Sequence, residues 1–420
     1  MSTTTVTVVG LGYVGLPLVQ EAVRAGLQVR GLDMSDRVVD GLNGGRSHVD
    51  DLSDDDVAQI LAGGFRATTD PAVIETSDVV VICVPTPLSA DGGPDLGAVE
   101  AACRTVAAHA RPGLLTVLES TTYPGTTDEV VKPILETSGL RVGEELMLAF
   151  SPERIDPGNP TYGMKNTPKV VGGTDEASRD AAVAFYSAFV DTVVPARGTR
   201  EAETAKLLEN TYRHINIALV NEMARFCHEL DIDLWDVIRC ARTKPFGFQA
   251  FYPGPGVGGH CIPIDPNYLS YQVKATLGYP FRFVELAQEI NVGMPAYVVR
   301  RVQDLLNDSS RALRGAKVLL VGVTYKADIA DQRESPATPV ATQFLAQGAD
   351  LTYHDAKVSG WTVDGTPVTQ AEDVYAAAAE ADVTVLLQPH KEYDLGRLAE
   401  SAKVLFDTRG AVDHPGVARL

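Results

Sequence analysis

The sequence predicts an α/β protein in which two doubly wound units of alternating strands and helices are joined by a long central helix and a mainly helical region. Three observations favour this class. β-branched runs typical of buried parallel strands alternate with helical patterns at both ends of the chain, the middle carries few such runs, and 420 residues suffice for two or three domains. We expect these domains at residues 1–198, 199–306 and 307–420.

Composition and charge narrow the class of protein. With 45% hydrophobic and 22% charged residues the composition is ordinary for a globular protein, and the net charge of −19 argues against nucleic acid or an anionic membrane as a partner. The chain contains no run of about 18 apolar residues that would cross a membrane. Five cysteines without CxxC spacing, and a beginning without a signal-peptide pattern, lead us to expect a reducing cytoplasm.

A dinucleotide fingerprint opens the chain. The β-branched run Thr5–Val9 leads into Gly10-Leu-Gly12-Tyr-Val-Gly15, a helical pattern follows, and the next predicted strand leads to Asp33. We expect Gly10 to make the tight turn, Gly12 to let the backbone approach a pyrophosphate, and Gly15 to let the helix pack on the strand. Since the Asp33 carboxylate would repel a 2′-phosphate, NAD is favoured over NADP. The alternative is a glycine turn that binds no ligand.

Small hydroxyl side chains follow the next two predicted strands. The runs 78–84 and 114–118 lead to Thr86 and Thr121. Because a doubly wound sheet binds ligands at the carboxyl ends of its strands, both threonines are candidates to contact the nicotinamide half of the cofactor. Either could instead be the N-cap of a helix.

A carboxylate follows the fourth predicted strand. The run 146–150 leads to Ser151-Pro152-Glu153-Arg154, so Glu153 is expected at the same edge of the sheet, over the reacting centre. A surface ion pair between Glu153 and Arg154 is an equally good interpretation.

The middle of the chain is dominated by one long helical pattern. From Glu201 to Met223 apolar residues recur at intervals of three and four, and Lys206 and Asn210 share one face. A lysine and an amide on one rigid helix would supply donors to an oxyanion, although a lysine on a helix more often lies on a solvated face. A long helix between two α/β units is also a natural surface for a homodimer or a higher homo-oligomer.

The Gly/Pro-rich stretch from Phe251 to Pro266 has the composition of a built site. Its glycines and prolines fix an irregular backbone that can approach a ligand closely. Of the five cysteines only Cys261 lies in such a loop, and His260 and Asp265 lie near it in the sequence. A thiol beside a base can act as a nucleophile, whereas the alternative is a small buried thiol next to a tight turn.

The last part of the chain, from Gly315 to Phe406, repeats the pattern of strands and helices without a G-x-G-x-x-G motif. It predicts a second Rossmann-like unit that is not a second NAD site of the first kind. Lys326, Arg333 and Arg409 follow its predicted strands, and such basic groups in an acidic chain are suited to bind the phosphates of a second ligand.

In this order the motifs resemble those of the UDP-glucose/GDP-mannose dehydrogenase family over nearly the whole chain. They are Gly10-x-Gly12-x-x-Gly15, Pro85-Thr86-Pro87, Ser120-Thr121, Ser151-Pro152-Glu153, Lys206-x-x-x-Asn210, Gly258-Gly-His-Cys261-x-x-x-Asp265, Tyr325-Lys326 and Arg333-Glu-Ser-Pro336. The resemblance implies an N-terminal NAD domain, a central dimerisation helix and a C-terminal domain for the nucleotide of a nucleotide sugar. It also implies oxidation of the sugar C6 alcohol to a carboxylate in two steps, with two NAD reduced.

The resemblance implies roles for single residues. Cys261 would be the nucleophile that holds the C6 aldehyde as a thiohemiacetal and then as a thioester, Lys206 and Asn210 the oxyanion donors, and Asp265 and Glu153 the groups for water and proton transfer, with Thr121 nearby. The expected cofactor-binding residues are Gly10, Gly12, Tyr13, Val14, Gly15, Asp33, Thr86, Thr121, Lys326 and Arg333. The expected substrate-binding residues are Glu153, Arg154, Lys206, Asn210, Tyr252, Gly258, Lys326 and Arg409, and no metal is expected.

The sequence of the cysteine loop indicates which nucleotide sugar is the substrate. His260 before the cysteine, Ile264 before the aspartate and Pro157-Gly158 resemble the branch that acts on UDP-N-acetylhexosamines. UDP-glucose or dTDP-glucose is the alternative substrate. Two other activities stay open: a two-electron dehydrogenase of the β-hydroxyacid type, which would need no thiol, and a nucleotide-sugar sensor without catalysis.

Overall fold

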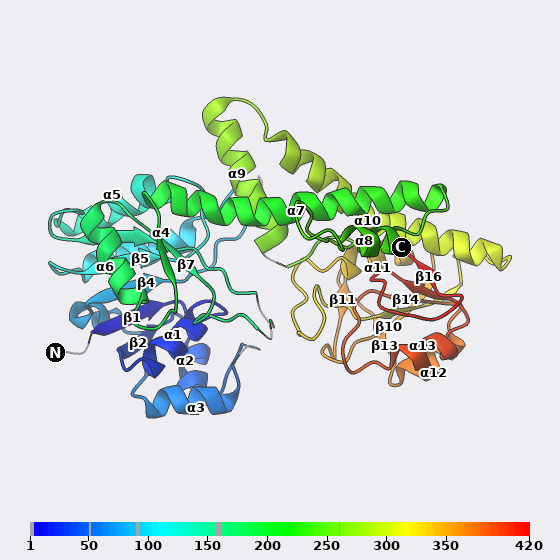
Figure 1. Cartoon of the computed structure of the whole chain (residues 1–420). Helices are drawn as coiled ribbons and strands as arrows, with labels where there is room; N and C mark the ends of the chain where they lie inside the picture. The colour runs from blue at the N-terminus through cyan, green and yellow to red at the C-terminus, as the bar shows by residue number, and fades with distance from the viewer. Residues whose placement is uncertain (1–3, 50–51, 90–92, 157–158, 160, 260) are drawn as a thin grey trace. The chain divides into compact units, whose positions relative to one another are not determined.

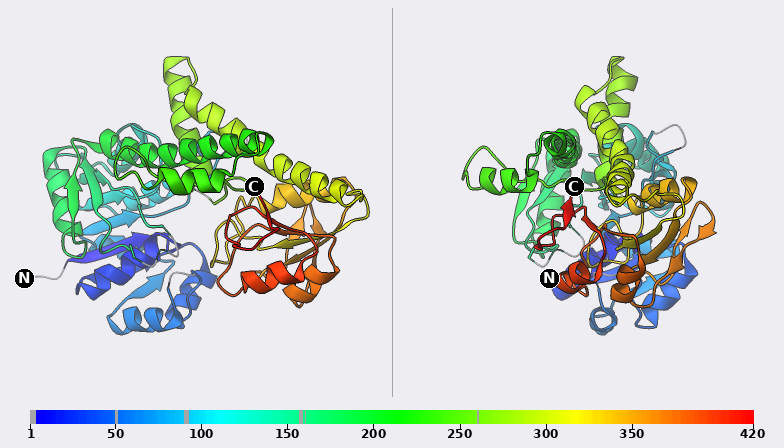
Figure 2. Two further views of the ribbon diagram at one scale, coloured as in Figure 1. Left: turned by 45° about the vertical axis from the view of Figure 1, so that its right-hand side comes forward. Right: turned by 90° about the vertical axis from the view of Figure 1, so that its right-hand side faces the viewer.

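The computed structural model describes residues 4–49, 52–89, 93–156, 159, 161–259 and 261–420. The chain forms two compact units, each built around its own sheet (Figures 1 and 2). The N-terminal unit consists of Met1–Glu209 and Asn267–Tyr279, and the C-terminal unit of Asn210–Pro266 and Pro280–Leu420.

An eight-stranded sheet forms the centre of the N-terminal unit, with the strand order β3-β2-β1-β4-β5-β6-β7-β8. Neighbouring strands are parallel except for β6 and β7, which pair antiparallel. The order reverses between β1 and β4, which is where a doubly wound sheet binds its ligand. The strands are β1 (Thr5–Val9), β2 (Gln28–Leu32), β3 (Arg66–Thr68), β4 (Val79–Ile82), β5 (Leu115–Leu118), β6 (Met147–Phe150), β7 (Lys169–Gly173) and β8 (Val193–Pro195).

Helices cover both faces of this sheet, because its central strands are apolar on both sides. In β4, Val79 and Val81 join one buried cluster, whereas Val80 and Ile82 join a second one on the opposite face. The helices are α1 (Gly15–Arg24), α2 (Asp36–Asn43), α3 (Asp54–Ala62), α4 (Gly97–Ala108), α5 (Lys132–Leu135) and α6 (Glu176–Tyr186), with short 3-10 helices at Pro71–Thr76 and Glu136–Ser138 and a π-helical turn at Thr127–Val131.

Four helices follow: α7 (Thr199–Glu229), α8 (Leu234–Ala241), α9 (Cys261–Leu277) and α10 (Arg282–Asp308). The long helix predicted from 201 to 223 is confirmed and extends beyond both predicted ends. α7 begins in the N-terminal unit and continues into the C-terminal unit. α9 does the reverse, because its residues from Asn267 on belong to the N-terminal unit.

The C-terminal unit contains a six-stranded parallel sheet with the order β13-β10-β9-β14-β15-β16. This order again places the first strand between the second and a later one, as in a doubly wound fold. Its strands are β9 (Lys317–Val321), β10 (Asp350–His354), β13 (Thr369–Gln370), β14 (Val383–Leu386), β15 (Leu405–Asp407) and β16 (Ala418–Arg419), beside the hairpin β11 (Thr362–Val363) and β12 (Thr366–Pro367). Its helices are α11 (Ala337–Ala346), α12 (Val374–Glu380) and α13 (Leu395–Ser401).

The predicted fold class is confirmed, and each predicted strand lies within a residue or two of its expected place. The sequence analysis missed the short outer strands, among them the antiparallel β7. That strand ends in two glycines and lacks the uniform β-branched pattern, so its pairing with β6 is a tertiary contact that local propensity does not reveal. Within the described residues, no helix has the length and apolar character needed to span a bilayer.

Candidate active site

The glycine turn after β1 has the geometry that a dinucleotide site requires. Gly10 has a φ of 90°, and a Cβ there would lie 2.6 Å from the carbonyl oxygen of Cys83. A Cβ on Gly15 would lie 1.9 Å from the carbonyl oxygen of Gly10, so only glycine lets α1 start so close to β1. A Cβ on Gly12, in contrast, would meet no heavy atom within 4 Å, which leaves open space beside the backbone.

The start of α1 and the end of β2 suit the two halves of an adenosine diphosphate. Val14, at the N-cap position of α1, makes no side-chain cap, and the first turn contains no acidic residue, so the helix dipole is available to a phosphate. Asp33 accepts hydrogen bonds from the N–H groups of Leu11 and Ser35 at 3.0 and 2.9 Å, one on each carboxylate oxygen. Each oxygen keeps a lone pair for a ribose hydroxyl. Tyr13 lies partly exposed in the same turn. These residues fit NAD.

The segments that follow β4 and β5 are joined by a hydrogen bond. The Thr86 hydroxyl donates to the carbonyl oxygen of Thr121 at 2.8 Å, and Thr86 is buried. The hydroxyl of Tyr268, from α9, donates to the carbonyl oxygen of Thr86. Among the described elements no helix has Thr86 or Thr121 as its N-cap, so the capping interpretation is wrong.

Glu153 is buried, and its carboxylate faces inward. Its Oε1 accepts from the N–H groups of Arg154 and Ile155, and its Oε2 lies 3.9 Å from Nζ of Lys169. Arg154 instead pairs through two nitrogens with Glu209. The predicted alternative of a surface ion pair between Glu153 and Arg154 is therefore wrong.

Lys169 joins Glu153 to a second buried carboxyl, that of Glu119 at the end of β5. Nζ of Lys169 lies 3.1 Å from Oε2 of Glu119, and the Tyr186 hydroxyl donates to Oε1. Burial, opposed by the Lys169 ammonium, raises the pKa of Glu119 to about 7. This group was not predicted from the sequence; a lysine directly before the two valines of β7 is the only local signal for it.

Lys206 lies inside the protein, with only 7% of its surface exposed. Its Nζ donates to the carbonyl oxygen of Glu153 at 2.6 Å. The interpretation of Lys206 as a member of a solvated helix face is therefore wrong, and α7 brings this cation to the segment that follows β6.

Asn210, one helical turn after Lys206 on α7, donates from Nδ2 to Oδ2 of Asp265. Asp265 is buried in the first turns of α9, and Cys261 is the first residue of that helix. The side chain of Cys261, His260 and the pair Pro157-Gly158 lie outside the described residues.

The loop before α9 is held within the C-terminal unit. The N–H of Gly254 donates to Oδ1 of the buried Asn221 at 2.9 Å, and the N–H of Gly259 donates to the carbonyl oxygen of Arg333 at 3.0 Å. A Cβ on Gly258 would lie 2.6 Å from the carbonyl oxygen of Glu334, so glycine is needed for this approach. The cysteine loop thus packs against the segment that carries the Arg333-Glu-Ser-Pro336 motif.

The predicted basic groups of the C-terminal unit differ in their surroundings. Arg409 is partly buried and donates from Nε to the carbonyl oxygen of Leu387 at 2.7 Å, and burial lowers its pKa to about 10. A Cβ on Gly254 would lie 2.7 Å from Nη1 of Arg409, so this arginine borders the glycine loop. Arg333 is exposed and pairs with Asp331, and Lys326 is partly buried.

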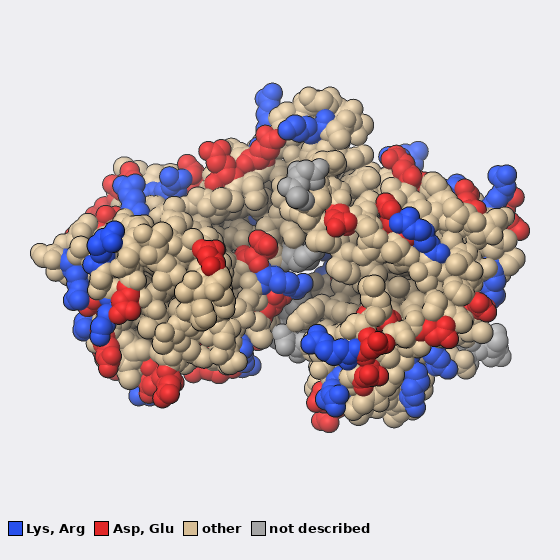
Figure 3. All heavy atoms as spheres, turned by 180° about the vertical axis from the view of Figure 1, so that it is seen from behind, with Lys and Arg blue, Asp and Glu red and all other residues tan. Residues whose placement is uncertain are grey.

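Tyr252, a further predicted substrate residue, is exposed and stacks on Trp235 with a centroid distance of 6.1 Å. The Arg242 guanidinium donates to its hydroxyl at 3.2 Å. On the face drawn in Figure 3, acidic and basic side chains are interspersed. The basic groups suited to phosphates are therefore individual residues at strand ends, in a chain whose net charge is −19.

The predicted site residues thus form two sets. The N-terminal unit gathers Gly10, Gly12, Tyr13, Val14, Gly15, Asp33, Thr86, Thr121, Glu153, Arg154 and Lys206, and the C-terminal unit gathers Asn210, Tyr252, Gly258, Asp265, Lys326, Arg333 and Arg409.

Three family models match the chain in succession. They are the NAD binding domain, the central domain and the UDP binding domain of the UDP-glucose/GDP-mannose dehydrogenase family, over residues 4–190, 200–292 and 319–414. The segment with the glycine turn, Thr86, Thr121 and Glu153 is therefore the family's NAD-binding domain.

Individual proteins match over almost the whole chain. A UDP-N-acetyl-D-mannosamine dehydrogenase of Methanocaldococcus jannaschii is 32% identical, with 97% of this chain and 92% of that protein covered. An NDP-N-acetyl-D-galactosaminuronic acid dehydrogenase of Ralstonia nicotianae is 34% identical, with 97% and 96% covered. The solved structure of a UDP-N-acetylmannosamine dehydrogenase from Pyrococcus horikoshii matches with a TM-score of 0.89 and 31% identity, covering 99% of this chain and 98% of that one.

Proposed function

Since the chain belongs to the UDP-glucose/GDP-mannose dehydrogenase family, we propose that it oxidises the C6 alcohol of a UDP-N-acetylhexosamine to the carboxylate of a uronic acid. As a member of this family it is an NAD-dependent oxidoreductase. UDP-glucose or dTDP-glucose is the second candidate substrate. The names of the similar proteins and the His260-Cys261 sequence both support the N-acetylhexosamine.

One observation carries the proposal best: the hydrogen bond from Asn210 to Asp265 connects α7 to the first turns of α9, where Cys261 begins the helix. A carboxylate and an amide of the predicted site are therefore joined within the C-terminal unit, and the carboxylate belongs to the helix that Cys261 begins. Lys206, one turn away on α7, is buried and donates to a carbonyl oxygen, so its ammonium is fixed in place.

In the proposed mechanism the C6 alcohol is first oxidised to an aldehyde. The thiolate of Cys261 then adds to this aldehyde and forms a thiohemiacetal, which is oxidised to a thioester. Water then attacks the thioester, and the C–S bond breaks to release the carboxylate and the thiol. NAD, when bound, accepts the hydride in both oxidations. The covalent adduct keeps the carbon in place, whereas a free aldehyde would diffuse away or be hydrated.

Lys206 and Asn210 stabilise the oxyanion that develops at C6, and Asp265 and Glu153 serve water and proton transfer, with Thr121 nearby. The main chain of Glu153 has a second role in the proposed mechanism. Its carbonyl oxygen holds Nζ of Lys206, so Glu153 also orients the cation.

The nucleotide and the cofactor are proposed to bind to different sheets. The glycine turn and Asp33 hold NAD, and Lys326, Arg409 and Tyr252 contact the nucleotide sugar. Arg333 and Lys326 are proposed to reach the cofactor as well. We also propose three domains, 1–198, 199–306 and 307–420, which the three successive family matches over residues 4–190, 200–292 and 319–414 support.

We further propose a homodimer, or a higher homo-oligomer, formed through α7. Tyr212, Leu219 and Phe226 recur every seven residues on this helix, and they are 47%, 55% and 45% exposed. Exposed apolar residues on one helix face favour a second copy as the partner. Leu219→Asp is expected to shift the mass measured by light scattering toward the monomer.

The function is tested by incubating the protein with NAD and UDP-N-acetylmannosamine, UDP-N-acetylglucosamine, UDP-glucose or dTDP-glucose and following nicotinamide absorbance. We expect the highest kcat/KM with a UDP-N-acetylhexosamine and two NADH per sugar. No NADH from any of them would contradict the proposal.

The Cys261→Ser variant and the wild type together test the two other candidate activities. In Cys261→Ser a two-electron dehydrogenase of the β-hydroxyacid type would keep its turnover, whereas the proposed enzyme loses it. A sensor without catalysis would bind UDP but produce no NADH even in the wild type.

A further inference from the structure

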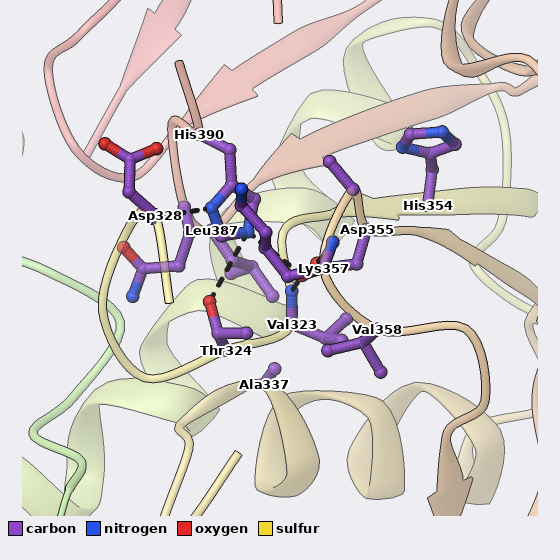
Figure 4. Close-up of polar contacts among 12 residues, drawn as sticks. Val323, Thr324, Asp328, Ala337, His354, Asp355, Lys357, Val358, Leu387 and His390 are labelled. Carbon is purple, nitrogen blue, oxygen red and sulfur yellow. Dashed lines mark hydrogen bonds and ion pairs between the residues drawn. The ribbon is translucent and has the colours of Figure 1, made fainter. Parts of the chain in front are cut away.

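A buried polar cluster lies at the carboxyl edge of the C-terminal sheet, where β9, β10 and β14 end (Figure 4). It consists of Thr324, which follows β9, Asp355, which follows β10, and His390, which follows β14. All three side chains are buried. The proposed function gives none of them a role.

His390 is hydrogen-bonded through both ring nitrogens. The backbone N–H of Asp328 donates to Nδ1 at 2.9 Å, and Nε2 lies 3.1 Å from Oδ2 of Asp355. Because a backbone N–H can only donate, Nδ1 must accept, so the ring carries its proton on Nε2 and donates it to Asp355. The nearby carboxylates of Asp328 and Glu392 could suggest a cation site, but both His390 nitrogens are already engaged.

Asp355 is suited to accept this hydrogen bond as an ionised carboxylate. Burial raises its pKa, but the hydrogen bonds from His390 and from the N–H groups of Lys357 and Val323 outweigh burial and hold the pKa below its ordinary value. The two backbone donors lie at 2.7 and 2.6 Å. With His390 added, Oδ2 accepts two hydrogen bonds and Oδ1 accepts one, all from groups inside the protein.

His390 accepts a hydrogen bond from the backbone of Asp328, which has an unusual conformation. This residue has a φ of 66°, a conformation that residues other than glycine rarely adopt without support. Its N–H is held by His390, and its Oδ1 accepts from the N–H of Lys391 at 2.8 Å. Figure 4 shows the imidazole between the backbone of Asp328 and the segment of Asp355.

The loop that is held in this way carries predicted ligand contacts. Thr324 donates from its hydroxyl to the carbonyl oxygen of Lys326 at 2.7 Å, and Gln388 donates from Nε2 to the carbonyl oxygen of Tyr325 at 2.7 Å. Residues 388–391 therefore hold the loop on both sides of Lys326, at Tyr325 and at Asp328. The same loop ends at Arg333, which accepts from the glycine loop before Cys261.

In the N-terminal sheet the carboxylate that corresponds to Asp355 is that of Asp33, which forms no hydrogen bond to a histidine within the described residues. Asp33 follows β2 as Asp355 follows β10, and each accepts the N–H of the residue after the turn glycine, Leu11 at 3.0 Å and Val323 at 2.6 Å. In the first fold the free side of the carboxylate suits a ribose diol. In the second fold His390 occupies that side.

We propose that His390 is a positioning residue for the nucleotide-sugar site: it closes the ribose position of the second fold and uses Asp355 to hold the loop of Lys326 ready for the diphosphate. This inference deepens the proposed function and rests on it. The nucleotide consequently binds to the loop and the ends of β14 and β15 rather than to the carboxylate after β10.

The test compares three variants with the wild-type enzyme. His390→Asn keeps an acceptor near the position of Nδ1, His390→Gln keeps a donor near the position of Nε2, and His390→Ala keeps neither. His354→Gln is the matched control, because the His354 ring contacts the Tyr393 hydroxyl and, within the described residues, forms no hydrogen bond to residues 324–335. The dissociation constant of UDP is measured by calorimetry, KM and kcat by NADH formation, and the exchange of the Asp328 amide by hydrogen–deuterium exchange.

We expect His390→Ala to raise the dissociation constant of UDP and the KM for the nucleotide sugar by about tenfold. The KM for NAD should rise clearly less, because the glycine turn and Asp33 are untouched and only the proposed contacts of Lys326 and Arg333 to the cofactor are loosened. Exchange at residues 324–335 should increase, and His390→Asn should restore most of the UDP affinity. If His390→Ala does not fold, the UDP affinity and the loop exchange of His390→Asn are compared with those of His390→Gln, and this comparison tests the inference.

Unchanged UDP affinity and unchanged exchange in the variants would overturn the inference, as would an equal rise of both KM values, which indicates general destabilisation. A wild type that neither binds UDP nor forms NADH would overturn the proposed function. In that event the loop exchange still tests whether His390 holds the loop.

Discussion

The two sheets of this protein use the same backbone connections at the ends of their central strands. Gly10 follows β1 with a φ of 90°, and its N–H donates to the carbonyl oxygen of Leu32 at 2.9 Å. Gly322 follows β9 with a φ of 79°, and its N–H donates to the carbonyl oxygen of His354 at 2.9 Å. The turn that opens a dinucleotide site is therefore present twice.

The difference lies in what surrounds each turn. Gly12 and Gly15 allow α1 to begin immediately after β1, whereas α11 begins only at Ala337, after the loop that carries Lys326 and Arg333. In the second unit no described helix begins directly after the first strand, and the loop that follows this strand carries cationic side chains. In the proposed function one fold binds phosphates through its backbone and the other through side chains, so the same strand order would serve two different kinds of ligand site.

The glycine turn offers the test with the largest expected effect. Gly15→Ala would place a Cβ 1.9 Å from the Gly10 carbonyl oxygen, so we expect a loss of at least about 3 kcal/mol in the free energy of unfolding. Gly12→Ala meets no atom within 4 Å and should fold normally while binding NAD more weakly. Urea unfolding and NAD titration measure both, and equal stability of the two variants would contradict the packing argument.

The next test separates chemistry from nucleotide binding. Lys206→Ala removes one oxyanion donor and should lower kcat by about a hundredfold. Lys326→Ala should mainly raise the KM for the nucleotide sugar, by about tenfold, because a phosphate contact is lost. Steady-state kinetics with both substrates varied check this, and an unchanged kcat in Lys206→Ala would remove Lys206 from the mechanism.

The two carboxylates after the second strands allow a direct comparison. Asp33→Asn should raise the KM for NAD by about tenfold, since a charged partner of the ribose is lost. It should cost less stability than Asp355→Asn, because Asp33 is partly exposed and water can satisfy the N–H group that loses its acceptor. Asp355→Asn should cost about 2 kcal/mol of stability without changing the KM for NAD, because the amide presents a donor to buried N–H groups. If Asp355→Asn instead raised the KM for NAD and Asp33→Asn caused the larger loss of stability, the ribose position at Asp33 would not be the open one.

The smallest expected effect concerns pH. Burial raises the pKa of Glu203 in the N-terminal unit to about 7, and lowers that of His214 in the C-terminal unit to about 4. The folded form holds the Glu203 proton more tightly than the unfolded form, so this stabilisation is complete below about pH 4.5 and is lost as pH rises through about 7. For His214 the sign is reversed, and its stabilisation is lost as pH falls from about 6.5 through about 4.

We therefore expect Glu203→Gln to flatten the decline of stability between about pH 5 and 8, and His214→Gln to flatten the rise from about pH 4 to 6, each by on the order of 1 kcal/mol. Hydrogen–deuterium exchange resolved by peptide assigns each change to its unit. A Glu203→Gln variant with the same pH profile as the wild type would show that the buried carboxyl does not bind its proton as proposed.

The fold could be predicted because its signals are local. The run Thr5–Val9, the three glycines and Asp33 each imply a conformation by themselves, and their order implies the sheet. The helical middle was equally visible from apolar spacing over α7.

The surroundings of the site residues could not be predicted, since they depend on contacts between distant segments. Nothing local to Lys206 reveals the carbonyl oxygen of Glu153 that holds it, and a solvated position was the more common expectation for such a lysine. Likewise, Lys169 lies in an outer strand that propensity missed, so its link between Glu119 and Glu153 appeared only with the structure. Arg154 was expected near Glu153 but is drawn to Glu209 by a bidentate geometry.

The path of α9 has a consequence for how the protein is made. Residues Asn267–Tyr279 belong to the N-terminal unit, and Tyr268 is buried there against Thr86. A ribosome synthesises the chain in order, so the first unit lacks this tyrosine until more than half of the polypeptide has been translated. The NAD-binding half consequently reaches its final packing only after the cysteine loop has left the exit tunnel, which couples the maturation of both halves in time.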